Sequence, residues 1–179
     1  RLRLLDRLAG ADEFGYEAAV VREPARRLAV VTAACDTAAE AGAVVGRCIG
    51  RLLAAVAGAP WTPPVWGLFP LDLADGMRVA AGVETDRVPP GTRAETLPAG
   101  PVASTLHTGP YAELPLAYHA LLAWIHERGL RPCPPAREAY LVAPGEADPA
   151  ELLTRVVVPI DAGDLAEEEI EALIKEEVW

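Results

Sequence analysis

Apolar positions along the second half of the chain follow two different periods, which predict alternating strands and a helix. Residues 112–128 carry an apolar stripe at helical spacing, formed by Leu114, Ala117, Tyr118, Leu121, Leu122 and Ile125. Three short runs are typical of strands, because they are rich in β-branched residues or alternate between apolar and polar ones. They are Val102–Thr108, Ala136–Val142 and Thr154–Ile160. The pattern therefore predicts one strand–helix–strand–strand unit.

The first half of the chain shows the same succession of patterns. Strand-like runs lie at 16–21 and 26–33, and a long Ala-rich helix is expected at 36–57, with further strands at 61–69 and 77–84. Pro24 to Val83 spans 59 positions, and so does Pro101 to Ile160, which suggests an internal duplication. We therefore predict an α+β fold of two fused strand–helix–strand–strand repeats, at about 14–86 and 92–161. Two antiparallel sheets would pack about a pseudo-two-fold axis, with a ligand groove between the repeats.

The register of the two repeats singles out one carboxylate, Glu138. Aligning the two Pro-Pro pairs places Gly67 opposite Glu138 and Phe69 opposite Tyr140. Glu138 and Tyr140 are two positions apart on a strand, so their side chains share one face. A buried carboxylate is costly, so an inward Glu138 is expected to be protonated, bonded to Tyr140 or another hydroxyl, or waiting for a cation.

Charge is distributed unevenly and argues against nucleic acid as a direct partner. The net charge is −10, and residues 161–179 contribute −7 of it through eight acidic residues and one lysine. The other 160 residues are close to neutral and carry no basic stripe that could neutralise phosphates. The apolar run at 38–59 is interrupted by Arg47 and Arg51, so no membrane span is expected.

Cysteine and histidine usage predicts neither a metal site nor a cofactor. The chain has three cysteines, Cys35, Cys48 and Cys133. An odd number without CxxC spacing favours reduced thiols in a cytoplasmic protein. His119 and His126 are seven positions apart on the predicted helix without a third ligand, so we interpret them as solvent-facing.

Both ends of the chain carry helical patterns with open interpretations. Residues 1–12 have the composition of the end of an amphipathic linker helix, which would either join a homodimer or pack on its own domain. Residues 162–179 form an acidic extension that carries Ile170, Leu173, Ile174 and Val178 on one helical face. This extension would dock on the domain or on a partner, or remain a solvated tail.

Three stretches together resemble the GyrI-like small-molecule-binding family. They are HTGPYAELPLAYHALLAWI at 107–125, PPAREAY at 134–140 and VVVPI at 156–160. The family includes effector-binding domains at the C-termini of MerR- and AraC-type drug-sensing regulators. One departure is Arg155, where such proteins often carry an acidic residue.

The resemblance implies a domain at 13–161 with an aromatic-lined pocket that holds one acidic residue and accepts large, flat, often cationic drugs. In this sequence the ligand-binding residues would be Glu138, Tyr140, Trp66, Phe69 and Tyr111. In MerR-type regulators, a helix in the place of residues 1–12 forms the dimer. The implied role is multidrug sensing or antibiotic resistance by a bacterial transcription regulator.

Two rival functions remain open. Some standalone members of the resembled family are hydrolases of reactive drugs, and Glu138 with Tyr140 would then position water and protonate a leaving group. The sequence offers no nucleophile–base pair, so we assign no catalytic residue. Other members inhibit a protein, DNA gyrase, and the acidic extension is the feature that would serve such an interaction.

Overall fold

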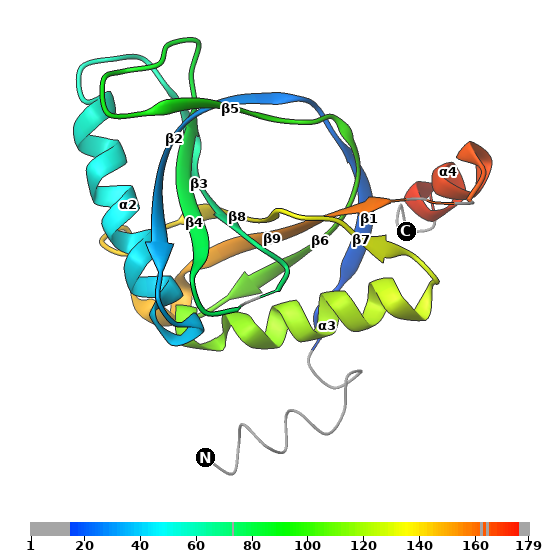
Figure 1. The fold of residues 1–179 in the computed structure, drawn as a ribbon. Helices are drawn as coiled ribbons and strands as arrows, with labels where there is room; N and C mark the ends of the chain where they lie inside the picture. The colour runs from blue at the N-terminus through cyan, green and yellow to red at the C-terminus, as the bar shows by residue number, and fades with distance from the viewer. Residues whose placement is uncertain (1–14, 73, 162, 164, 176–179) are drawn as a thin grey trace.

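The computed structural model describes residues 15–72, 74–161, 163 and 165–175. Most of the strands form one curled antiparallel sheet in the order β1-β6-β9-β8-β3-β4-β2-β5, and the two-residue β7 pairs with β9 (Figure 1). The strands are β1 (Ala18–Glu23), β2 (Arg26–Cys35), β3 (Thr62–Phe69), β4 (Met77–Glu84), β5 (Arg93–Leu97), β6 (Gly100–Thr108), β7 (Arg131–Pro132), β8 (Ala136–Val142) and β9 (Leu153–Asp161). The α-helices are α2 (Ala41–Val56), α3 (Leu114–Glu127) and α4 (Glu167–Lys175). Short 3-10 turns lie at Ala38–Glu40, Tyr111–Glu113 and Pro149–Glu151. The α+β fold class is confirmed.

The two halves of the domain join edge to edge through β3 and β8. Outward from that pair, one half runs β3-β4-β2 and the other β8-β9-β6, so the strand order is the same in both. We expected two sheets that pack face to face, whereas the strands form one continuous sheet. Pairing β3 with β8 gives each strand a hydrogen-bonding neighbour where two separate sheets would leave open edges. The internal duplication itself stays a prediction.

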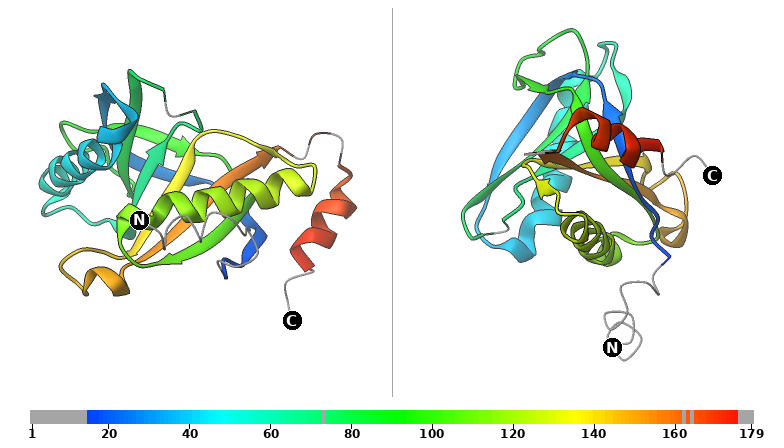
Figure 2. Two further views of the ribbon diagram at one scale, coloured as in Figure 1. Left: turned by 90° about the horizontal axis from the view of Figure 1, so that it is seen from below. Right: turned by 90° about the vertical axis from the view of Figure 1, so that its right-hand side faces the viewer.

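Helices α2 and α3 both lie on the convex side of the curl, which we call the outer face (Figures 1 and 2). Helix α3 packs on one half of that face, with Leu121 and Ile125 against Val156. Helix α2 packs on the other half, where Leu52 contacts the cluster that contains Val83. The opposite side of the sheet, which we call the inner face, carries neither of these helices.

Most element boundaries follow the sequence pattern. Strands β4 and β8 begin and end where predicted, while α3 starts two residues late because the 3-10 turn Tyr111–Glu113 precedes it. Strands β5 and β7 were not predicted. Strand β5 is mostly exposed up to the buried Leu97 and has no apolar run, and it forms by pairing with β2.

Helix α4 docks on its own domain in the part of the extension that the structure describes. Ile170 is buried, and Leu173 and Ile174 pack against the core beneath α3. Arg22 of β1 pairs with Glu167 and Glu171 of α4. Docking on the domain, one of the predicted alternatives, is therefore what residues 167–175 do, whereas the predicted linker helix at 1–12 lies outside the described residues.

The described residues also bear on the other expectations about partners. Cys35 and Cys48 are buried free thiols, and Cys133 is partly buried. His119 and His126 are exposed, and no cluster of three metal-ligating side chains occurs in the described part of the chain. Among those same residues, no helix has the length and apolarity needed to cross a membrane.

Candidate functional site

Glu138 lies at the centre of β8 and points to the outer face, between the two halves of the domain. It pairs with Gly67 of β3 across the β3–β8 contact. Its Oε1 accepts a hydrogen bond from Tyr118 Oη at 2.9 Å, and its Oε2 accepts one from Tyr140 Oη at 2.8 Å. Both oxygens of the carboxyl group are therefore held by neutral donors, one from α3 and one from its own strand.

Burial sets the electrostatics of this group. The side chain of Glu138 is 6% exposed, and Tyr140 is 8% exposed. Loss of water raises the pKa of Glu138 above its ordinary value, although the hydrogen bonds from Tyr140 and Tyr118 oppose that rise. Burial, with the negative charge of Glu138, also raises the pKa of Tyr118 and Tyr140 well above the ordinary phenol value. The tyrosines therefore stay protonated and remain donors at physiological pH.

Gly67 provides the space in which Tyr140 can reach the carboxylate. A Cβ atom at Gly67 would lie 2.3 Å from Tyr140 Oη and 3.0 Å from a ring carbon of Phe69. These distances place Phe69 beside the Gly67–Tyr140 contact, and Phe69 itself packs partly buried between the cores under α2 and α3. The glycine aligned with Glu138 in the predicted repeats also pairs with Glu138 across the two strands, and close packing requires a glycine there.

Tyr111 forms the exposed edge of the site. Its ring lies 5.7 Å from the Tyr140 ring, centroid to centroid, at an interplanar angle of 51°. Tyr111 is 36% exposed and belongs to the 3-10 turn that leads into α3. Because its neighbours inward are Tyr140 and then Glu138, a ligand that approached the carboxylate here would meet aromatic rings first.

Trp66 does not join the other predicted site residues. Side chains alternate along a strand, so Trp66, adjacent to Gly67, points to the inner face. There it is 2% exposed and packs in a cluster with Leu28 and Leu97. Tyr118, which we interpreted as part of the apolar helix stripe, donates a hydrogen bond to Glu138. Its hydroxyl group was the signal in the sequence, because a buried tyrosine hydroxyl usually needs a hydrogen-bond partner.

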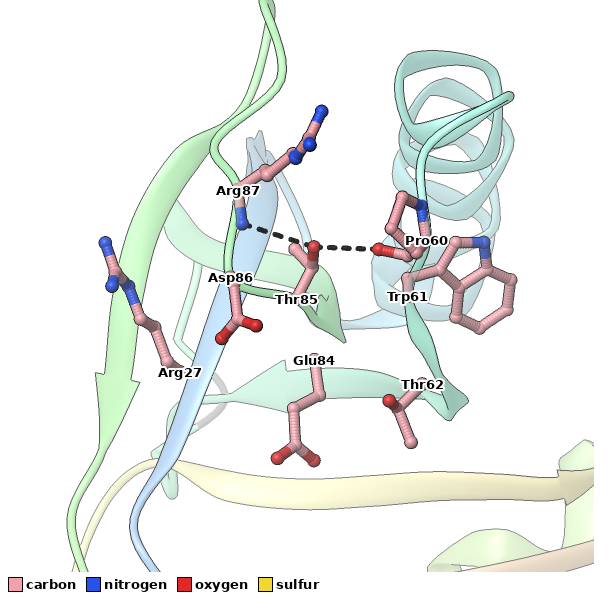
Figure 3. A pocket seen from close by; sticks show the side chains of 8 residues that line it. All are labelled: Arg27, Pro60, Trp61, Thr62, Glu84, Thr85, Asp86 and Arg87. Carbon is pink, nitrogen blue, oxygen red and sulfur yellow. Dashed lines mark hydrogen bonds between the residues drawn. The ribbon is translucent and has the colours of Figure 1, made fainter.

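A cavity of about 650 Å³ opens elsewhere, beside the ends of β3 and β4 (Figure 3). Its lining is largely polar and includes Arg27, Glu84, Asp86 and Arg87 besides Trp61. Thr85 Oγ1 donates a hydrogen bond to the carbonyl oxygen of Pro60 at 3.0 Å. None of the residues that contact Glu138 lines it. It is therefore separate from the aromatic site.

The arrangement around Glu138 suits charge recognition better than covalent chemistry. A carboxylate within an aromatic surrounding offers charge pairing and cation–π contact to a flat cation. A hydrolase would need a nucleophile, or a water held between base and substrate. In the described residues the buried thiols Cys35 and Cys48 belong to the clusters under α2, away from Glu138.

A family profile for the GyrI-like small molecule binding domain matches residues 17–161. The chain belongs to this family. The match spans both halves of the curled sheet and contains every predicted site residue. A search of curated protein sequences finds no match.

Solved structures show the same fold at low sequence identity. The C-terminal domain of EcmrR superposes with a TM-score of 0.69 at 22% identity, over 83% of this chain and 99% of that one. EcmrR in a complex with DNA gives 0.70 at 19% identity, over 89% of this chain and 63% of that chain. SAV2435 bound to tetraphenylphosphonium gives 0.56 at 13% identity, over 81% of this chain and 94% of that chain. A hydrolase from Listeria innocua gives 0.59 at 14% identity, over 81% of this chain and 92% of that chain.

Proposed function

We propose that this domain binds a hydrophobic, aromatic, cationic small molecule at Glu138, as the effector-binding domain of a cytoplasmic transcription regulator that senses drugs. The observation that carries the proposal is a buried carboxylate whose two oxygens are held by Tyr118 and Tyr140. Neutral donors leave the negative charge uncancelled, so a bound cation would supply the missing opposite charge. Tyr111 and Phe69 add aromatic surface for stacking.

Ligand entry requires side chains to move, because Glu138 is nearly closed off from solvent. Tyr111 is the exposed residue of the group and lies on a short 3-10 turn, so it is the first side chain that a ligand would displace. The cost of moving it would be offset by burial of the ligand and by pairing with the carboxylate.

The regulatory part of the proposal rests on the likeness to EcmrR, which was solved with DNA bound. This chain covers 63% of that protein, so DNA binding would come from sequence outside the matched part. Ligand binding would change transcription by favouring one arrangement of the linked domains. In such a regulator a helix-turn-helix domain would supply the DNA binding, and residues 1–12 would be the end of the helix that joins the dimer.

Calorimetric titration with tetraphenylphosphonium tests the proposal, with triphenylphosphine oxide as a neutral aromatic of similar size. We expect saturable binding of the cation and an affinity loss of at least tenfold, or about 1.4 kcal/mol, in Glu138→Gln. Affinity for the neutral compound should change little. Glu127→Gln, an exposed acid at the end of α3, serves as the matched control and should bind like the wild type.

Mass spectrometry of each probe after incubation separates binding from catalysis. A changed ligand mass that disappears in Glu138→Gln would favour the hydrolase alternative. Equal loss of cationic and neutral ligand in Glu138→Gln would show that the carboxylate does not recognise charge.

A further inference from the structure

The inner face of the sheet carries a cluster of one buried and two partly buried arginines that the site at Glu138 does not use. Arg137 precedes Glu138 on β8 and therefore points to the opposite face. Its side chain is 1% exposed, and its Nε and Nη1 atoms are buried without a hydrogen-bond acceptor in the described structure. A guanidinium group carries five N–H donors and stays charged, so two buried nitrogens without an acceptor are costly.

Two further arginines surround Glu23 of β1 on the same face. Arg155 donates to Glu23 Oε1 at 2.6 Å, and Arg26 donates to Glu23 Oε2 at 3.0 Å. Arg26 also donates to Glu84 at 3.0 Å. Glu23 thus accepts from Arg155 and Arg26, while Nε and Nη1 of Arg137 make no hydrogen bond to it in the described structure.

The cluster carries more positive than negative charge. Three guanidinium groups, on Arg26, Arg137 and Arg155, face two carboxylates, Glu23 and Glu84, which leaves one positive charge in excess. Burial lowers the pKa of Arg137, Glu23 raises it, and Arg26 and Arg155 lower it further. A single excess charge held among low-dielectric neighbours is the situation in which an anion gains most from binding.

A second buried donor and an opening lie next to these arginines. Trp66 Nε1 has no acceptor in the described structure, and the guanidinium carbon of Arg26 lies 5.1 Å from the Trp66 ring centroid. Glu84, bonded to Arg26, also lines the polar cavity of Figure 3. Glu84 therefore lies between the cavity and Arg26, while Arg26, Arg137, Arg155 and Trp66 do not themselves line the cavity.

We propose that the inner face holds a second site, for a small oxyanion of carboxylate or phosphate chemistry, built by Arg137 together with Arg26 and Arg155. The oxyanion accepts hydrogen bonds from the unpaired nitrogens of Arg137 and neutralises the excess charge. This site lies on the opposite face of β8 from Glu138 and does not depend on cation binding there.

Titration with inorganic phosphate, followed by NMR of the arginine Nε–H and tryptophan indole N–H groups, tests the proposal. Acetate serves as the carboxylate arm, and chloride at matched ionic strength as the control for bulk salt. We expect saturable shifts of the Arg137 Nε–H and Trp66 indole signals with phosphate or acetate, absent with chloride. Trp66→Phe assigns the indole signal.

Variants then separate this site from its surroundings and from the aromatic site. Arg137→Met should weaken phosphate binding at least tenfold, while Arg93→Met, an exposed arginine of the same face paired with Glu95, should leave it unchanged. Glu138→Gln should also leave it unchanged, so failure here and failure of the cation site are distinguishable.

Shifts equal in phosphate and chloride, or shifts that persist in Arg137→Met, would overturn the proposal. If Arg137→Met does not fold, the wild-type titration alone decides, because an Arg137 satisfied by internal water would show no saturable response to phosphate.

Discussion

Arg137 and Glu138 are neighbours on one strand, yet their side chains differ in how their hydrogen-bonding groups are satisfied on the two faces of the sheet. On the outer face, both oxygens of Glu138 accept hydrogen bonds from tyrosines. On the inner face, Arg137 has two buried nitrogens without an acceptor, although Glu23 lies close enough to influence its pKa. Hydrogen-bonding capacity is satisfied at Glu138 and left open at Arg137, while a net charge remains on both faces.

The difference shows that a buried charge can point to a ligand in two distinct ways. At Glu138 the neutral donors keep the carboxylate oriented without cancelling its charge, so the proposed site would be organised before a cation binds. At Arg137 the observation that points to a ligand is that two buried nitrogens have no acceptor in the described structure. A single strand thus presents a buried carboxylate to one face and a buried guanidinium group to the other.

Among the substitutions that test the contrast between Glu138 and Arg137, Gly67→Ala is expected to have the largest effect. The new methyl group would lie 2.3 Å from Tyr140 Oη, so the hydroxyl must leave its position and lose its bond to Glu138. We expect a loss of about 1–3 kcal/mol in the free energy of unfolding, measured by urea denaturation.

Gly46→Ala is the matched control for this substitution. Gly46 lies exposed within α2, and a Cβ atom there meets nothing within 4 Å. The same change should therefore stabilise the protein, by up to about 1 kcal/mol, through helix propensity. Equal effects at both glycines would mean that the close contact with Tyr140 carries no weight.

Smaller effects, on stability and on the pKa of Glu138, are expected from Tyr118→Phe and Tyr140→Phe. Each change removes one donor to Glu138 and costs about 1 kcal/mol or slightly more. Because these bonds hold the pKa of Glu138 down against burial, each variant should raise that pKa further. NMR titration of the Glu138 side-chain carboxyl measures the shift, and an unchanged or lowered pKa would contradict the assigned contacts.

The sequence predicted the outer face well because its evidence is local. The bounds of β8 and the shared face of Glu138 and Tyr140 both follow from the strand periodicity of residues 136–142. The same periodicity should have excluded Trp66, because the residue next to Gly67 must point away from Glu138.

Contacts that depend on tertiary packing were not predictable in this way. Tyr118 reaches Glu138 only because α3 packs on the outer face and brings the hydroxyl group to β8. The arginine cluster joins side chains from β1, β2, β8 and β9, which are distant in sequence and meet only when the sheet curls. The pairing of β3 with β8, which joins the two halves into one sheet, was not predicted either, because it is also a contact between distant parts of the sequence.

The raised pKa of Glu138 also fixes the direction of its pH dependence. In the free protein its stabilising contribution is present below the ordinary carboxyl pKa of 4.5 and is lost as pH rises through the raised folded value. A bound cation favours the charged carboxylate and lowers its pKa. Cation affinity should therefore increase with pH across that window and then level off.

The most direct measurement of the central claim is the number of protons released when tetraphenylphosphonium binds. Calorimetry in two buffers with different ionisation enthalpies, at a pH just above 4.5, gives this number for the wild type and for Glu138→Gln. The account predicts net proton release in the wild type that is abolished in Glu138→Gln. Binding without proton release at any pH in this window, or equal release by both proteins, would contradict it.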